Sequence, residues 1–165
     1  MKRLLLVSLC MISPLLAQMM VTGLVKQYDD RSKNFEERPY GKDDVSYGLY
    51  VDFFEGLGAW RLGAGYASDL SGAGEADSVI TPELTLLATD GMWETGISAL
   101  IDYIDSEEET DWGDVYYQFQ LGLSLPITNR LQVGIHAFYP FSGFSDIKDI
   151  RIGDLDYGLL LRFKL

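Results

Sequence analysis

Apolar and polar side chains alternate along residues 45–66. Bulky apolar residues occupy every second position over 45–53 and again over 60–66, and small or polar residues lie between them. A period of two indicates β-strands, and the intervening Glu55-Gly56-Leu57-Gly58 indicates a tight turn. The segment is therefore predicted to be a β-hairpin with one bulky apolar face and one small, polar face.

The same alternation recurs along the rest of the chain and predicts eight strands, an even number. The first strand is the least regular, because Met19-Met20 blurs its pattern. Pro82 in the fourth strand removes a backbone donor and predicts a bulge there. The strands are expected at Met19–Gln27, Val45–Phe54, Ala59–Ala67, Val79–Thr89, Met92–Ile104, Val115–Leu125, Leu131–Tyr139 and Leu155–Leu165.

The connections between these strands alternate in length. Three are short, and the other four are long and polar; the short ones lie at 55–58, 90–91 and 128–129, and the long ones at 28–44, 68–78, 105–114 and 140–154. In an antiparallel meander, every second connection falls at the same end of the sheet. Short turns at one end and long loops at the other are typical of outer-membrane barrels.

The bulk of the apolar face decides which side of the sheet is inside. An eight-stranded barrel has an interior only just wide enough for side chains to fill. The Val, Leu, Tyr, Phe and Trp residues of the apolar face would overfill it, whereas the Gly, Ser and Ala of the other face fit. The bulky face must then point outward into lipid. We therefore expect an all-β fold, an eight-stranded antiparallel up-and-down transmembrane β-barrel.

Aromatic residues on the outward face fall into two groups along the predicted barrel. Aromatic rings favour the two membrane–water interfaces. Trp93 and Tyr103 are ten residues apart, which is about 33 Å along a strand, or about 25 Å of height at the usual tilt. The expected girdle comprises Tyr47, Tyr66, Tyr103, Tyr117, Tyr139 and Tyr157 at the long-loop end, and Phe53, Trp60, Trp93 and Phe163 at the short-turn end.

Residues 1–17 have the pattern of a secretory signal peptide. Lys2 and Arg3 precede a mainly apolar run, and Ala17 is a small residue at the expected cleavage point. The run is too short for a spanning helix. Residues 18–165 then form one outer-membrane barrel domain. Cys10, the single cysteine, lies in the signal segment, so disulfides are excluded from the mature domain.

The net charge of −12 at pH 7 argues against nucleic acid as a partner, because an acidic surface repels phosphates. Several charged residues nevertheless fall on the small inner face, where charges need partners or water. Asp52 and Arg61 lie opposite each other across the first turn and are expected to pair. The expected lumen residues are Asp52, Arg61, Glu83, Glu94, Asp102, His136, Asp156 and Arg162, with Lys164 at the end of the last strand.

Two interpretations of this inner face remain open. A salt-bridged plug that holds the barrel shut is favoured, and a narrow ion path is the alternative. His136, the only histidine, is expected to be structural, with Asp156 on the next strand placed to orient it. Catalytic and pH-sensing roles are the alternatives for His136.

The long loops carry candidates of their own. The 105–114 loop is acidic, and Glu107, Glu108, Glu109 and Asp111 are weak candidates for Ca²⁺ or Mg²⁺ ligands. A solvated acidic loop is favoured over that site or a docking surface for a basic partner. The 28–44 loop mixes charge signs and is expected to face solvent or lipopolysaccharide. Phe141, Phe144 and Ile147 are expected to pack the last loop, with partner contact as the alternative.

The whole domain resembles the small OmpA/OmpX-type outer-membrane barrels in architecture. Its last strand, Tyr157-x-Leu159-x-Leu161-x-Phe163-x-Leu165, resembles the terminal signal by which such barrels are recognised for assembly. The resemblance implies a Gram-negative outer membrane and the barrel-assembly machinery as a partner. The family includes structural and adhesive proteins and a few lipid-modifying enzymes, so the fold does not select the function.

These observations favour a monomeric, non-enzymatic envelope protein without a cofactor, whose outer loops contact lipopolysaccharide, cations or a partner. An outer-leaflet lipid-modifying enzyme is disfavoured, because the family's deacylase type has a Ser two residues after its His and this chain has Phe138. A narrow porin-like channel is disfavoured by the charged lumen. A soluble carrier is disfavoured by the outward tyrosines.

Overall fold

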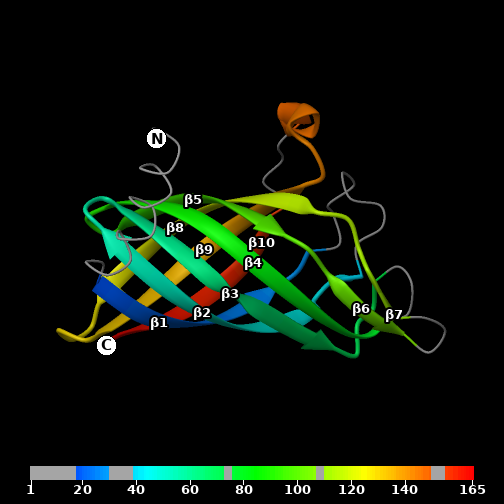
Figure 1. Ribbon diagram of the computed structural model, residues 1–165, viewed down its shortest axis with the longest axis horizontal. Helices are drawn as coiled ribbons and strands as arrows, with labels where there is room; N and C mark the ends of the chain where they lie inside the picture. Colours follow the sequence, from blue (N-terminus) through cyan, green and yellow to red (C-terminus); the bar gives the residue numbers. More distant parts are fainter. Residues whose placement is uncertain (1–17, 30–38, 73–75, 107–109, 150–154) are drawn as a thin grey trace, which may run out of the picture.

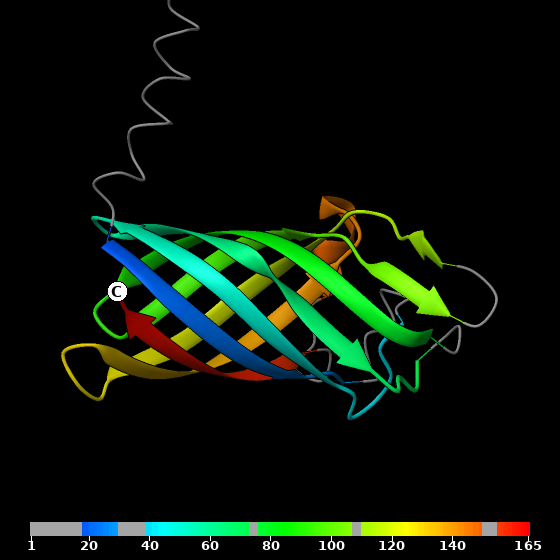
Figure 2. The same cartoon turned by 60° about the horizontal axis from the view of Figure 1, so that its bottom comes forward.

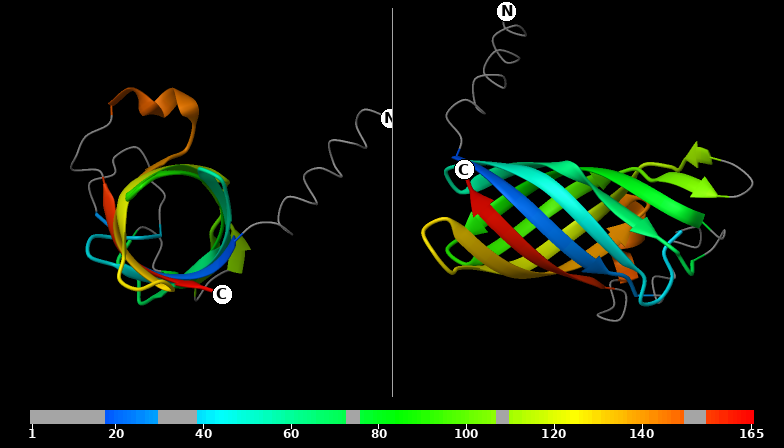
Figure 3. Two further views of the ribbon diagram at one scale, coloured as in Figure 1. Left: turned by 90° about the vertical axis from the view of Figure 1, so that its left-hand side faces the viewer. Right: turned by 90° about the horizontal axis from the view of Figure 1, so that it is seen from below.

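The chain forms a closed antiparallel β-barrel of eight strands, which Figure 3 shows end-on as a ring. The computed structural model describes residues 18–29, 39–72, 76–106, 110–149 and 155–165. Its elements are β1 (Gln18–Gln27), β2 (Val45–Glu55), β3 (Gly58–Ser68), β4 (Ala76–Asp90), β5 (Trp93–Leu100), β6 (Tyr103–Ser106), β7 (Thr110–Trp112), β8 (Tyr116–Pro126), β9 (Leu131–Phe141), the 3-10 helix η1 (Phe144–Asp149) and β10 (Asp156–Lys164).

Around the ring the strands follow the order β1, β2, β3, β4, β5, β8, β9 and β10, and the first strand pairs with the last. β1 pairs with β10 from Met20↔Lys164 to Gln27↔Tyr157, which closes the ring. Figure 2 shows this seam, where β1 and β10 lie side by side. Closure leaves no sheet edge in the barrel wall, which is a requirement for any β-structure in lipid.

Two of the eight wall strands continue beyond the ring. β6 resumes the course of β5 along β4, with Ile80 opposite Tyr103. β7 pairs with β6 and precedes β8, so the two short strands form a hairpin that projects past the rim (Figures 1 and 2). The predicted strand Met92–Ile104 is therefore interrupted between β5 and β6.

This interruption lies opposite Pro82. β4 keeps a regular register with β3 through the pair Ala64↔Pro82. The bulge predicted in β4 at Pro82 is therefore absent from this pairing. The partner strand breaks instead, and the Ile101 amide nitrogen is 3.4 Å from the Pro82 carbonyl oxygen. Since Pro82 has no N–H to donate, the ladder at this point lacks one bond.

The two faces of the sheet follow the alternation in the sequence. Apolar side chains of the outer face are largely exposed, and the inner face carries buried polar and charged groups. The prediction that the bulky face points outward is confirmed. Among the described residues, no helix is long and apolar enough to cross a membrane. The fully outward apolar residues include Leu49, Leu62, Leu121, Ile135 and Leu159.

Short turns lie at one end of the barrel and the long connections at the other, as the alternation in loop length predicts. Gly56 and Gly91 in two of the short turns have φ values of 61° and 63°. This left-handed backbone suits two-residue hairpin turns and favours glycine. The C-terminus lies at the short-turn end (Figures 2 and 3).

The outward position of Leu121 can be tested directly, because its side chain is 57% exposed on the apolar wall. Leu121→Arg should lower the folding free energy in lipid vesicles by about 2–4 kcal/mol, since a charge near the middle of the apolar band finds neither water nor a partner. Leu121→Phe is the matched control and should fold normally. Equal folding free energies for the two variants would show that the faces are inverted.

Candidate functional site

The structure places the eight residues expected along the lumen on the inner face of the barrel, each at most 6% exposed. Lys164, the ninth, is only half-buried at the end of β10. The eight divide into a layer nearer the short-turn end and a layer nearer the long-loop end, with a hydroxyl-rich group between them. In the middle group, Glu83 accepts hydrogen bonds from Thr85 (2.6 Å) and Ser98 (2.9 Å).

The layer nearer the short-turn end is a continuous chain of ion pairs. Arg61 holds Asp52 with Nε 2.8 Å from Oδ1 and Nη2 3.0 Å from Oδ2. Arg162 reaches the same carboxylate with Nε 2.8 Å from Oδ2. Its two terminal nitrogens bind both oxygens of Glu94 at 2.6 and 3.0 Å. Such forked, charge-assisted bonds are the strongest that side chains make, so this chain ties four strands together across the lumen.

His136, on a fifth strand, lies against the Glu94 end of this chain of ion pairs. Glu94 lies opposite Gly122, and Gly122 lies opposite His136. The imidazole therefore passes over Gly122 to reach Glu94, where its Nε2 is 3.3 Å from Oε2. A Cβ on Gly122 would lie 2.2 Å from Cδ2 and 2.5 Å from Cγ of His136. The place expected for Asp156 beside this histidine is taken by Glu94.

The second layer surrounds Lys26. Its ammonium lies 3.4 Å from Oδ2 of Asp156 and donates to Oε1 of Gln118 at 2.5 Å. It also lies over the Phe138 ring, 5.0 Å from the centroid. Lys26 was not predicted to lie in the lumen, because the irregular start of β1 hid its parity. The alternation in β1 could have revealed it, since Lys26 is in phase with Thr22 and Leu24 on the inner face.

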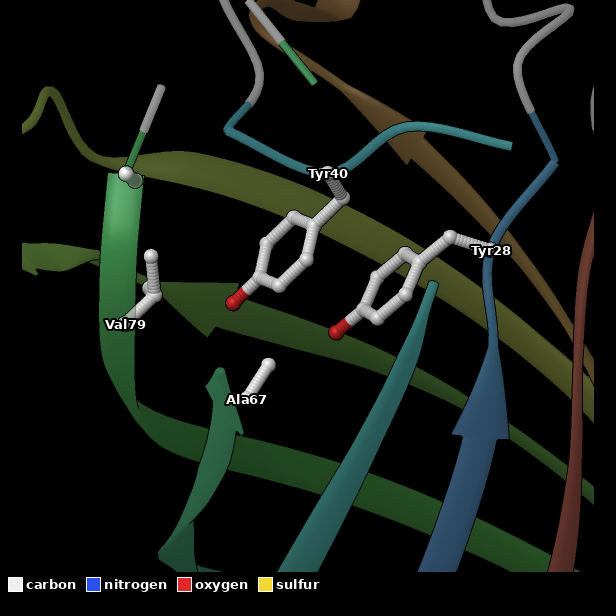
Figure 4. Close-up of a cluster of buried hydrophobic side chains, with 5 residues drawn as sticks. Tyr28, Tyr40, Ala67 and Val79 are labelled. Atoms are coloured by element: carbon white, nitrogen blue, oxygen red, sulfur yellow. The ribbon is translucent and has the colours of Figure 1, made fainter. Parts of the chain in front are cut away.

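A stacked pair of tyrosines covers the long-loop end of the lumen (Figure 4). The rings of Tyr28 and Tyr40 are 3.9 Å apart and nearly parallel, at 9°. They pack in a buried cluster with Ala67, Ala76 and Val79. Tyr40 comes from a long connection without regular secondary structure, so strand periodicity gave no reason to assign it to the interior.

Hydrogen bonds join this tyrosine cover to the wall beneath. Thr81 donates its hydroxyl hydrogen to Asp102 at 2.6 Å, so Tyr40, whose oxygen lies 2.6 Å from that of Thr81, is the donor to Thr81. Burial raises the pKa of the Tyr40 hydroxyl well above its ordinary value, and Tyr28, Tyr116 and Asp102 add to the shift. Tyr40 therefore keeps its proton and remains a hydrogen-bond donor to Thr81.

One wall of the lumen carries polar atoms that the protein itself leaves unbonded. In the described part of the chain, the buried side-chain atoms without a hydrogen-bond partner include Nε2 of Gln118, both amide atoms of Gln120, the Ser124 hydroxyl and Nδ1 of His136. These atoms lie on β8 and β9, and a further one, Oδ1 of Asp29, lies just after β1. Buried groups of this kind are the usual hydrogen-bonding sites of internal water. The opposite wall, on β1–β3, is filled by the Asp52 and Arg61 pair and the Tyr50 ring.

The expected aromatic girdle lies on the outer wall, with one correction. Six of its rings are 45–63% exposed, and three are partly covered. Tyr139 is only 4% exposed, although its parity points it outward. Its ring lies 6.2 Å from that of Phe141, which η1 covers. The exposed six are Tyr47, Tyr66, Tyr157, Trp60, Trp93 and Phe163, and the partly covered three are Phe53, Tyr103 and Tyr117.

The acidic-loop candidates divide between described and undescribed residues. Glu107, Glu108 and Glu109 lie outside the described residues. Asp111 is exposed on β7 and accepts a hydrogen bond from the amide of Trp112 at 2.7 Å. Among the described residues, no group of three or more Asp, Glu, His or Cys side chains is arranged to hold a metal ion.

A cleft of about 310 Å³ opens at the rim between Tyr47, Tyr66 and three carboxylates, Asp43, Asp44 and Asp69. Asp44 accepts bonds from the amides of Gly41 and Ser71 and from the Ser71 hydroxyl. This carboxylate therefore holds two loops together, which is a structural task.

Comparison with known proteins supports the fold. No protein-family model and no curated protein matches the chain. A structure from the de novo design of transmembrane β-barrels matches with a TM-score of 0.56 at 10% identity, over 90% of this chain and 96% of the other. Neisserial surface protein A (NspA) matches with a TM-score of 0.56 at 10% identity, over 89% and 97%.

These likenesses define the class. The chain has the fold of a small transmembrane barrel, eight-stranded, antiparallel and closed. This is the architecture that the resemblance to OmpA/OmpX-type barrels implies.

Arg162 is predicted to be the most sensitive residue of the lumen, because it binds both Asp52 and Glu94. Arg162→Met should cost about 3–5 kcal/mol of folding free energy in vesicles, since it leaves buried carboxylates with too few partners. Lys164→Met removes the same charge at the half-buried end of β10 and should cost much less. Adding Glu94→Gln to Arg162→Met should recover part of the loss. Equal urea midpoints for Arg162→Met and Lys164→Met would contradict this role.

Gly122 is predicted to be required for the position of His136. Gly122→Ala should lower folding stability by about 1–3 kcal/mol, because the imidazole must leave its place over β8. Gly23→Ala is the matched control, since a Cβ there would meet only the Leu161 carbonyl oxygen at 3.9 Å. Adding His136→Ala should relieve much of the Gly122→Ala defect. If the double variant is no more stable than Gly122→Ala in a urea titration, the overlap with the imidazole is not the cause.

Proposed function

We propose that the chain is an integral outer-membrane protein with a non-enzymatic role in envelope structure or surface interaction. The closed lumen carries this proposal. Arg162 spans from Asp52 to Glu94 through the interior, and the Tyr28–Tyr40 stack covers the long-loop end. A barrel that neither transports a solute nor catalyses a reaction in its lumen acts through its outer surface and its long loops. These loops are proposed to contact lipopolysaccharide, cations or a protein partner.

The interior disfavours the two alternatives. A narrow channel would need a continuous path past the Arg162–Glu94 fork, and eight strands leave room for little beyond side chains. A lipid-modifying enzyme would need a nucleophile and a base within reach of outer-leaflet lipid. His136 is 1% exposed and faces the lumen beside Glu94, so a lipid in the surrounding leaflet cannot reach it.

The route to the membrane is part of the same proposal. Residues 1–17 act as the export signal, and the assembly machinery recognises the alternating strand β10. The protein works as a monomer and without a cofactor.

The proposal is tested by two assays and a binding measurement. Planar bilayers containing the purified protein should show no conductance steps, and lipid A should be unchanged in cells with and without the protein. Conductance steps would favour the channel, and altered acylation would favour the enzyme. The thermal midpoint should rise in vesicles that contain lipopolysaccharide and Mg²⁺ compared with phosphatidylcholine alone. An unchanged midpoint would remove lipopolysaccharide from the proposed contacts.

A further inference from the structure

The helix η1 lies outside the barrel wall and not over its mouth. Figure 3, viewed along the barrel, shows η1 beyond the ring of strands, and Figure 1 shows it beside the wall at the long-loop end. The β6–β7 hairpin, by contrast, extends along the barrel axis. The chain leaving β9 therefore turns sideways, toward the space that surrounds the barrel.

Phe144 fixes η1 against aromatic rings of the outer wall. Its ring centroid is 5.2 Å from that of Tyr117 and 5.5 Å from that of Phe141. Phe141 lies in turn 4.8 Å from Phe119. Phe141 is 0% exposed although its strand parity points it outward. The first turn of η1 thus covers outward rings that would otherwise form part of the apolar wall.

Phe144 itself remains 60% exposed. Residues three apart in a 3-10 helix lie on the same side, so Ile147 shares a face with Phe144. This face continues the aromatic girdle. Tyr117, which belongs to the girdle, stacks on Phe141, and Phe144 packs edge-on against Phe141. Aromatic rings at this height favour the boundary between headgroups and acyl chains.

We propose that η1 is a membrane-interface element, with Phe144 inserted among the lipids of the leaflet at the long-loop end. The last long loop then rests on the membrane surface, while the β6–β7 hairpin projects into water. Two observations carry the assignment: the lateral position of η1 and the continuity of its exposed ring with the aromatic girdle. The inference rests on the proposed membrane location of the barrel.

The test places a 4-fluorophenylalanine at position 144, 119 or 138, one at a time, in the barrel refolded into phosphatidylcholine vesicles. Two paramagnetic reagents are compared by ¹⁹F NMR, a lipid with a nitroxide on its acyl chain and a water-soluble gadolinium chelate. Phe119 on the outer wall is the lipid-facing control. Phe138 in the lumen, 1% exposed, is the shielded control and should respond to neither reagent.

The inference predicts that the lipid nitroxide relaxes the fluorine at position 144 more than the chelate does. Stronger relaxation by the chelate, or no response to either reagent, would overturn it. Position 119 separates this failure from failure of the membrane location itself. If the nitroxide relaxes position 119 and not position 144, only the η1 inference fails. If it relaxes neither, the barrel is not in the bilayer and both proposals fail.

Discussion

The lumen depends on one side chain that satisfies two buried carboxylates. Arg162 binds Asp52 with one nitrogen and forks onto Glu94 with the other two. Charges in a narrow interior are costly unless each finds partners. Because Asp52 is also held by Arg61, and Glu94 also lies beside His136, the positions of these four side chains all depend on Arg162. The Lys26–Asp156 pair repeats the principle in the second layer.

The narrow interior also explains why glycine is frequent on the inner face. A large side chain can lie flat across the wall only where the residue beneath it has no Cβ. His136 lies over Gly122, and the Tyr50 ring lies over Gly48 and close to Gly63. In both cases a large inner residue is matched to a small one on its own or an adjacent strand. At these places the interior is filled by pairs of unequal size.

Much of the fold could be predicted from the sequence, because apolar and polar side chains alternate along a half-buried strand, and this alternation is visible within a short stretch of sequence. The eight strands, their facing and the ends at which the loops fall all follow from it. Contacts across the lumen do not. Asp52–Arg61 was predictable because one short turn sets their register, whereas Glu94 and Arg162 lie on strands three places apart around the ring. Tyr40 and η1 come from long connections, where no periodicity applies, so the covering of Phe141 by η1 could not be predicted either.

The position of Arg162 on β10 couples closure of the wall to neutralisation of the interior. β10 pairs with β1 along the seam and also carries the guanidinium that binds Asp52 on β2 and Glu94 on β5. If the seam opens, these two carboxylates lose their shared cation and water can hydrate them. Backbone closure and internal charge balance are therefore gained and lost together, which makes opening of the barrel at this seam a cooperative event.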